Sequence, residues 1–114
     1  MAVLKPKRGE VWWVNFNPAV GNEIQKTRPA VIVSNNHANK ILNRFQVIPL
    51  TSQIKKVYPS ECLVVVKSQV CKAMADQIRT ISPVRLGKKI ISLSDTDVIL
   101  VNRILVTQLC LDEF

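Results

Sequence analysis

Short apolar segments separated by polar loops dominate the first two thirds of the chain. Segments of this kind, rich in β-branched and aromatic residues, predict β-strands rather than helices. The expected strands cover residues 10–16, 29–34, 45–51, 61–67 and 75–82. Because the loops between them are short, we expect the strands to pair in an antiparallel, strongly bent sheet or small barrel.

Two of these segments carry a further constraint. The run from Pro29 to Val33 is apolar at every position, which indicates burial on both faces of the sheet. Pro49 lies inside the third segment and lacks the N–H group that a strand ladder needs, so we expect an edge or a bulge there. Residues 35–39 have the composition of a turn, which predicts one helical turn ending near Leu42.

The last part of the chain predicts a single long helix. Pro83 and Gly87 bracket an expected turn, and residues 88–93 connect it to the helix. Ser94, followed closely by two acidic residues, is typical of a helix N-cap, and the helix is expected to reach about Leu111. Its apolar residues occur on all sides, so one sheet cannot cover them. The remaining side is expected to face a second copy of the chain in a homodimer, or a deep groove of the monomer.

The length and composition fit one compact domain. The chain has 114 residues, of which 47% are hydrophobic, enough for one core but not two. We therefore expect a single domain over residues 1–114, mostly β with a C-terminal helix (α+β). The basic N-terminus lacks the apolar region of a signal peptide, and no segment is long and apolar enough to span a bilayer. These features predict a cytoplasmic protein without membrane association.

The cysteines argue against two classes of small protein. The chain contains 3 Cys, none of them in a CxxC pair, and 1 His. A disulfide framework or a Cys/His zinc site is therefore not expected. Cys62, Cys71 and Cys110 are expected to be small buried hydrophobic residues in a reducing compartment.

The charge of the chain points to an anionic partner. Lys and Arg number 16 against 8 Asp and Glu, for a formal net charge of +8. Within residues 1–56 the imbalance is 9 basic residues to 2 acidic ones. Such a balance favours a polyanion, although by itself it does not choose between RNA, DNA, an anionic membrane and an acidic protein.

Several kinds of catalytic site are missing from the sequence. It has no glycine-rich phosphate-binding motif and no nucleophile elbow, and its carboxylates are scattered rather than clustered for a two-metal site. His37 lies in an Asn-rich turn and is expected to be a surface residue. What remains is a set of polar residues at strand ends, above all Arg28 and Thr51.

Four ordered blocks of sequence resemble a known family. They are RGEVWWVNF at residues 8–16, GNEIQKTRPAVIV at 21–33, PLTS at 49–52 and DQIRTI at 76–81. Together they resemble the MazF/PemK (Kid) toxins of type II toxin–antitoxin modules over most of the chain. The resemblance implies an SH3-like small barrel of the CcdB/PemK/MazF type that carries a C-terminal helix and works as a homodimer.

The same resemblance implies an activity and partners. The activity would be sequence-preferring, metal-independent and cofactor-free cleavage of single-stranded RNA, such as messenger or ribosomal RNA. The products would be a 2′,3′-cyclic phosphate and a 5′-hydroxyl, and the cleavage would inhibit translation and growth. A cognate antitoxin with an acidic tail would block the RNA groove, and promoter DNA would be bound mainly through the antitoxin complex.

Three residues would carry the catalysis implied by this resemblance. RNA supplies its own nucleophile, the 2′-hydroxyl, so the enzyme needs to align it, neutralise the phosphate and move two protons. Arg28 can grip the phosphate through two bonds, and Thr51 can donate a hydroxyl hydrogen bond to it. Glu23 would act as a base or as an orienting group. Since a guanidinium stays protonated, we expect proton transfer through water rather than from Arg28.

Further polar residues are expected to bind the RNA. Tyr58 would either stack on a base or anchor its loop, and one of Trp12 and Trp13 is expected to face the core while the other is exposed or at the dimer interface. The expected RNA-binding residues are Asn22, Gln25, Lys26, Ser52, Lys55, Lys56, Tyr58, Asp76, Gln77 and Arg79.

The chain departs from the Kid-like branch of the family at two positions. That branch has a His at the position of Asn22 and an Arg at the position of Met74, although its Asp is retained as Asp76. Because Asn22 cannot shuttle a proton, the Arg28 and Thr51 chemistry of the MazF-like branch is favoured. Asp76 then orients the RNA or an arginine, or is a structural hydrogen-bond acceptor.

Two other functions remain open at this point. A CcdB-like protein of the same fold would poison gyrase and cleave nothing. A related module that has lost catalysis would bind nucleic acid without cutting it. The blocks around Arg28 and Thr51 favour the nuclease.

Overall fold

The computed structural model describes residues 5–113 of the chain. Within this part, seven β-strands and two α-helices follow one another, with two short 3₁₀ turns. In chain order they are β1 (Glu10–Asn15), β2 (Thr27–Ile32), α1 (Asn36–Ile41), β3 (Phe45–Thr51), β4 (Glu61–Val66), β5 (Gln69–Met74), η1 (Ala75–Gln77), β6 (Arg79–Ile81), η2 (Pro83–Arg85), β7 (Leu86–Ser92) and α2 (Asp95–Leu109).

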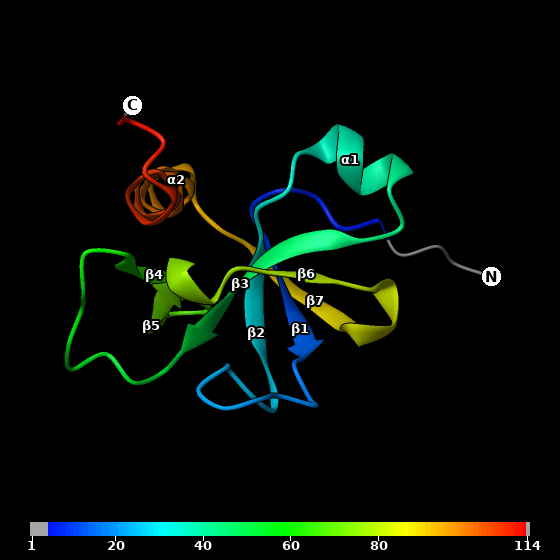
Figure 1. Cartoon of the computed structure of the whole chain (residues 1–114), viewed down its shortest axis with the longest axis horizontal. Helices are drawn as coiled ribbons and strands as arrows, with labels where there is room; N and C mark the ends of the chain where they lie inside the picture. The colour runs from blue at the N-terminus through cyan, green and yellow to red at the C-terminus, as the bar shows by residue number, and fades with distance from the viewer. Residues whose placement is uncertain (1–4, 114) are drawn as a thin grey trace.

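The strands form one strongly bent sheet. Its order is β4-β5-β3-β2-β1-β7, and β6 pairs with β3 beside this path. All of these pairs are antiparallel. In Figure 1 the sheet curves into a half-barrel, with α2 lying over β4 and β5 and α1 at the opposite side. The expected class, mostly β with a C-terminal helix, is confirmed.

Hydrophobic side chains fill both faces of the sheet, as the apolar run after Pro29 predicted. Val31 contributes to a cluster that also contains Val101 and Ile104 of α2. Its neighbours Ala30 and Ile32 point the other way, into the hollow of the bend. That second cluster consists of Trp12, Val14, Phe16, Ala30, Ile32, Phe45, Val47 and Ile81.

The two tryptophans separate as expected along β1. Trp12 is 7% exposed and Trp13 is 44% exposed. The indole Nε1 of Trp12 donates to Glu10 Oε1 at 3.1 Å, and Lys89 Nζ lies 2.9 Å from Glu10 Oε2. Burial raises the pKa of the Glu10 carboxyl, but hydrogen bonds from Lys89, the backbone of Lys7 and Trp12 outweigh it, and the pKa lies below its ordinary value of 4.5.

The region after β4 differs from the expectation of one strand over residues 75–82. Residues Ala75–Gln77 form the 3₁₀ turn η1, and only Arg79–Ile81 are a strand. The preceding strand β5 was not predicted. It forms a hairpin with β4 through Lys67 and Ser68, whose φ angles of 48° and 66° are unusual for residues other than Gly, Asn and Asp.

Strand β7 is a second correction. Gly87 was expected to end a turn, but it lies inside β7, which pairs with β1. A Cβ atom at residue 87 would lie 3.1 Å from the Cβ of Trp13, closer than ordinary contact allows. The glycine therefore allows the two strands to approach each other, a use of Gly that differs from turn formation.

Pro49 is neither at an edge of the sheet nor at a bulge. It lies in the interior strand β3, opposite Ala30 of β2. On its other side β3 changes partner, pairing with β6 up to Val47 and with β5 from Leu50 onward. The missing N–H of Pro49 falls near this change of partner, which explains why an interior strand tolerates it.

Helix α2 begins as predicted and ends slightly earlier. The Ser94 side chain accepts a hydrogen bond from the Asp97 backbone, and Cys110 ends the helix in the left-handed conformation, with φ 52°. Ile99 and Leu109 remain exposed, in line with the expectation that one sheet cannot cover this helix. In the part of the chain described, no helix is long and apolar enough to cross a membrane.

The cysteines agree with the prediction only in part. Cys62 and Cys71 are buried, whereas Cys110 is exposed at the end of α2. Burial, helped by the negative charge of Asp97, raises the pKa of the Cys62 thiol to about 11. The exposure of Cys110 follows from its place in the cap, where the chain leaves the helix.

Candidate active site

Arg28 and Thr51 come from two neighbouring strands. β2 and β3 run antiparallel, with Ala30 opposite Pro49. Arg28 lies two residues before Ala30 and Thr51 lies two residues after Pro49, so both emerge on the same face and at the same end of their strands. Because adjacent strands lie about 4.8 Å apart, this arrangement suits two side chains that hold one phosphate.

Both side chains are partly positioned by hydrogen bonds. Arg28 Nε donates to the backbone carbonyl of Gln25 at 2.9 Å, which leaves the two terminal nitrogens for a ligand. Those nitrogens can grip two oxygens of a phosphate at once. Thr51 Oγ1 accepts a hydrogen bond from the Gln53 backbone at 3.2 Å, so its own proton can still be donated.

Loop 16–26, which precedes Arg28, is fastened to the end of the sheet by Gln77 and Arg79. Gln77 Oε1 accepts from the backbone of Ile24 at 3.1 Å, and its Nε2 donates to the carbonyl of Asn22 at 3.4 Å. Arg79 Nη1 donates to the carbonyl of Phe16 at 3.0 Å. Two of the residues expected to bind RNA therefore also hold this loop in place.

The same loop is closed by hydrogen bonds of its own. Phe16 donates its backbone N–H to the carbonyl of Lys26 at 2.9 Å, and Lys26 donates to Asn17 Oδ1 at 3.0 Å. The Glu23 carboxylate accepts from the backbone of Val20 at 2.8 Å through one oxygen. Its second oxygen is left for another partner, as a base or orienting group requires.

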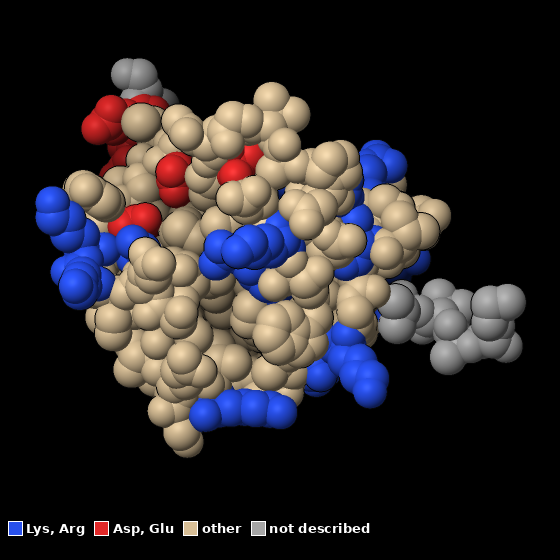
Figure 2. All heavy atoms as spheres, turned by 90° about the horizontal axis from the view of Figure 1, so that it is seen from below, with Lys and Arg blue, Asp and Glu red and all other residues tan. Residues whose placement is uncertain are grey.

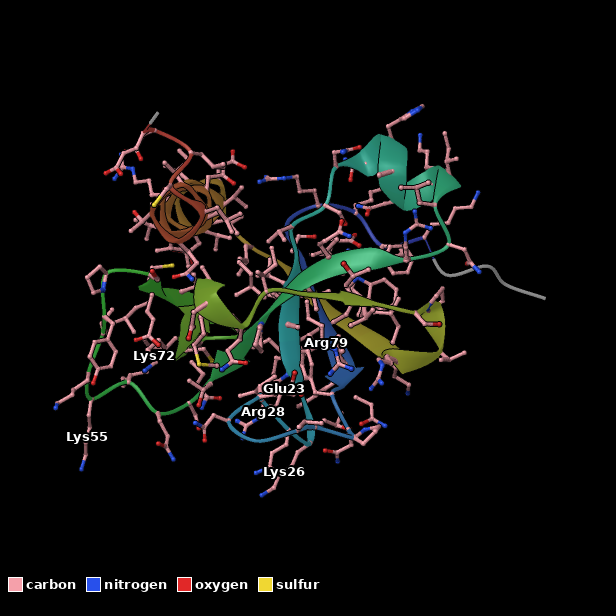
Figure 3. All side chains as sticks on the ribbon, in the orientation of Figure 1. Glu23, Lys26, Arg28, Lys55, Lys72 and Arg79 are labelled. Atoms are coloured by element: carbon pink, nitrogen blue, oxygen red, sulfur yellow. The ribbon has the colours of Figure 1, made fainter. Side chains whose placement is uncertain are left out.

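Four of the expected site residues line one hollow of about 270 Å³. They are Glu23, Asp76, Gln77 and Arg79. Figure 3 shows Glu23, Arg28 and Arg79 grouped at the lower ends of β1 and β2, with Lys26 on the outside of the loop. The carboxylates and the guanidinium groups thus come from two separate parts of the sequence, residues 23–28 and 76–79, to one end of the sheet.

A larger groove of about 710 Å³ follows loop 52–60. It is lined by Ser52, Gln53, Ile54, Lys55, Lys56 and Lys72. The register places Lys72 of β5 directly opposite Thr51 of β3. Its Nζ lies 3.3 Å from Glu61 Oε1 and donates to the carbonyl of Lys56 at 3.0 Å. The groove therefore begins beside Thr51 and has basic side chains along it.

Tyr58 lies on the outer part of the same loop. Its side chain is 58% exposed, and its backbone N–H donates to Glu61 Oε1 at 2.9 Å. It lines a hollow of about 290 Å³ together with Asp76 and Gln108 of α2. The exposed ring suits stacking on a base better than it suits anchoring the loop.

The charge on this side of the molecule is mostly positive. Figure 2 views the molecule from the side of loop 16–26 and shows Lys and Arg spread over the face, with Asp and Glu gathered toward the upper left. Across residues 5–113, no three His, Cys, Asp or Glu side chains gather in a way that could hold a metal ion. The arrangement can bind an anionic chain and stabilise charge on a phosphate through protein groups.

Comparison with known proteins decides the family. A model described as PemK-like, MazF-like toxin of type II toxin-antitoxin system matches residues 7–109. The chain belongs to this family. It is 45% identical over 93 residues to endoribonuclease MazF9 of Mycobacterium tuberculosis, covering 74% of this chain and 79% of that relative. The predictions of a MazF/PemK-family toxin and of an endoribonuclease are confirmed by these similarities.

Solved MazF structures share the fold. The crystal structure of MazF from Deinococcus radiodurans superposes with a TM-score of 0.82 at 27% identity, over 95% of this chain and 99% of that one. An endoribonuclease in complex with its cognate antitoxin, from a mycobacterial species, gives a TM-score of 0.79 at 23% identity, covering 93% and 96% of the two chains. The barrel with a C-terminal helix expected of the MazF/PemK type is thereby confirmed.

Among the lining residues that sequence reasoning missed in this MazF-family toxin are Lys72 and Gln108. Lys72 was missed because its strand, β5, was not predicted. The alternation of Cys71 and Ala73 with Lys72 between them was the available sign of a half-buried strand. Gln108 lies on a helix that was assigned to packing, and no feature of the sequence brings it next to Tyr58.

Proposed function

We propose that this MazF-family toxin cleaves single-stranded RNA without a metal ion, by using the RNA's own 2′-hydroxyl as the nucleophile. The observation that supports the proposal is the placement of Arg28 and Thr51 at the same end and on the same face of two neighbouring strands. A cation with two terminal NH2 groups and a hydroxyl donor are the groups that phosphoryl transfer needs when no metal takes part.

Cleavage follows an in-line path. The 2′-oxygen attacks the adjacent phosphorus while the bond from phosphorus to the 5′-oxygen of the next nucleotide breaks. Arg28 and Thr51 bind the non-bridging oxygens, on which negative charge grows. The 2′-hydroxyl proton leaves toward Glu23, directly or through water, and a water molecule donates a proton to the leaving 5′-oxygen. The proton held by Glu23 then neutralises the hydroxide that this water has become. The products are a 2′,3′-cyclic phosphate and a 5′-hydroxyl.

The remaining residues of the site hold the RNA and the loops. Gln77 and Arg79 keep loop 16–26 in place, and Asp76, between the two smaller hollows, orients the RNA. Tyr58 stacks on a base beside the groove. The side chains that contact the RNA from loops 16–26 and 52–60 are Asn22, Gln25, Lys26, Ser52, Lys55 and Lys56.

The toxin works with partners of two kinds. A cognate antitoxin occupies the basic groove with an acidic segment, and the resulting complex binds promoter DNA mainly through the antitoxin. A second copy of the toxin covers the exposed side of α2, where Ile99 is half exposed. We place this single-domain protein in the cytoplasm, where its messenger RNA substrate is made.

The test is to incubate the purified protein with a long RNA in EDTA and to map the ends of the products. We expect discrete cuts with 5′-hydroxyl ends, which disappear in Arg28→Ala. RNA that is bound but left intact would instead support a non-catalytic module. Intact RNA together with gyrase trapped on DNA would support the CcdB-like alternative.

A further inference from the structure

Lys72 lies in the same cross-strand row as Thr51, yet the reaction path above gives it no role. The two residues are directly opposite each other on β5 and β3. Directly opposed residues of an antiparallel pair have Cβ atoms about 5 Å apart and project on the same face. The stem of the lysine therefore starts beside the hydroxyl that holds the scissile phosphate.

The Lys72 ammonium is contacted on two sides by its surroundings. Its side chain is 12% exposed, with Glu61 Oε1 at 3.3 Å and the Lys56 carbonyl accepting a hydrogen bond at 3.0 Å. An ammonium group has three N–H donors, so these two partners leave one for a ligand. The side chain lines the groove of about 710 Å³, in which that ligand would lie.

Arg28 and Lys72 lie on opposite sides of Thr51 in the sheet. β2, which carries Arg28, and β5, which carries Lys72, are separated by β3. Two strand spacings amount to roughly 10 Å between their backbones. Figure 3 shows Lys72 beside loop 52–60 and Arg28 at the end of β2. Two cations placed in this way suit two different phosphates.

We propose that Lys72 binds the phosphate next to the scissile one and thereby sets the register of the RNA across Arg28 and Thr51. This inference rests on the proposed function. Unlike the exposed Lys55, Lys72 is already held by two contacts, so it loses less conformational freedom when the RNA binds. Because Glu61 offsets part of the ammonium charge, the phosphate contact depends on the remaining N–H donor as well as on charge attraction.

The test uses short RNAs built around a mapped cleavage site. Each carries a 2′-deoxy nucleotide at that site, so that it binds without being cut, and one uncharged methylphosphonate whose position is varied along the series. Affinities are measured for the native protein and for Lys72→Met. We expect the variant to bind the all-phosphate RNA about tenfold more weakly, the usual effect of losing one charge-assisted hydrogen bond.

The decisive observation is the methylphosphonate position at which Lys72→Met no longer weakens RNA binding. With the methylphosphonate at one position flanking the scissile phosphate, native protein and Lys72→Met should bind equally well. The slope of log affinity against log salt should also fall by about 0.7 in the variant. Lys55→Met is the matched control, and we expect its smaller loss to be the same at every methylphosphonate position.

Two results would overturn the proposal. If the Lys72→Met loss is the same at every position, or absent, Lys72 serves only to hold the Lys56 carbonyl. If the loss of affinity disappears when the methylphosphonate replaces the scissile phosphate, Lys72 binds the same phosphate as Arg28. Lys72→Gln, which can still donate to that carbonyl, repeats the scan if Lys72→Met does not fold. Failure of the proposed function would be separate, since the native protein would then leave ordinary RNA uncut.

Discussion

The two loops beside the candidate site are attached to the sheet in different ways. Loop 16–26 receives side-chain hydrogen bonds from both Gln77 and Arg79 and has further bonds within itself. Loop 52–60 is held at its far end by side chains, through Lys72 and Glu61. The first loop is part of the folded framework, whereas the part of the second loop around residues 56–58 is held by one pair of charged residues.

This difference matches the tasks of the two loops. Loop 16–26 supplies the Gln25 carbonyl that orients Arg28, and an orienting group has to be in place before the RNA arrives. In the proposed function, loop 52–60 supplies basic and aromatic side chains that bind the RNA beyond the scissile bond. A loop with fewer hydrogen bonds to the sheet can adjust its shape to the RNA that it binds.

The largest effect is expected at the residue that the first loop orients. Arg28→Ala should lower the single-turnover cleavage rate by about 10²–10³-fold, the scale of losing a group that stabilises transition-state charge. Arg28→Lys should recover only part of this rate, because an ammonium cannot grip two oxygens as a guanidinium does. Equal rates for Arg28→Lys and the native protein would show that a point charge is sufficient.

The second-largest effect is expected when the hydrogen bonds that fasten loop 16–26 to the sheet are removed. Gln77→Leu removes the two hydrogen bonds that Gln77 makes with loop 16–26 and leaves the N–H of Ile24 without its partner. We expect the free energy of unfolding to fall by about 1–3 kcal/mol, with a slower cleavage rate at saturating RNA. The control Gln53→Leu, in the second loop, should change stability by less than about 0.5 kcal/mol. Equal losses in the two variants would remove the distinction between the loops.

Much of the sheet, and the start of the helix α2, could be predicted from the sequence alone. β1, β3 and the start of α2 were predictable because their apolar spacing and the Ser94 cap are local features. β5 and β7 were not, because Lys67 and Ser68 form a hairpin turn without glycine and Gly87 serves strand contact rather than a turn.

The candidate site, too, could be predicted from the sequence only in part. Arg28 and Thr51 could be singled out by their place at strand ends and by the family resemblance. The contacts of Gln77 and Arg79 could not be predicted, since their partners lie 53 and 63 residues away in the sequence. Lys72 was hidden for the same reason, because it meets Thr51 only through the register of the folded sheet.

Glu10 of β1, which lies outside both loops, provides a reference for the free energy of unfolding and its dependence on pH. The pKa of Glu10 is lowered in the folded protein, so its contribution is present above about pH 4.5 and is lost as the pH falls through the folded-state pKa. Glu10→Gln should cost about 1 kcal/mol at pH 7 and should flatten the fall in stability between roughly pH 5 and pH 3. Urea unfolding across this pH range measures both effects. They would be contradicted if the free energy of unfolding of Glu10→Gln fell with decreasing pH as steeply as that of the native protein.

The smallest effect is expected at the attachment of the second loop. Glu61→Gln weakens the ion pair with Lys72 and the hydrogen bond from the backbone of Tyr58. We expect a loss of about 0.5–1 kcal/mol and faster hydrogen exchange at the Tyr58 amide. Exchange at the Ile24 amide should stay the same. Faster exchange in both loops would show that they are not independent.

The central claim is that the RNA itself supplies the nucleophile at a phosphate held by Arg28 and Thr51. The most direct measurement is single-turnover cleavage, in EDTA, of an RNA in which only the nucleotide 5′ to one scissile bond is 2′-deoxy. We predict that this bond stays intact while other cleavage sites in the same molecule are cut at their usual rate. Cutting of the deoxy site at the rate of its ribonucleotide counterpart would contradict the account.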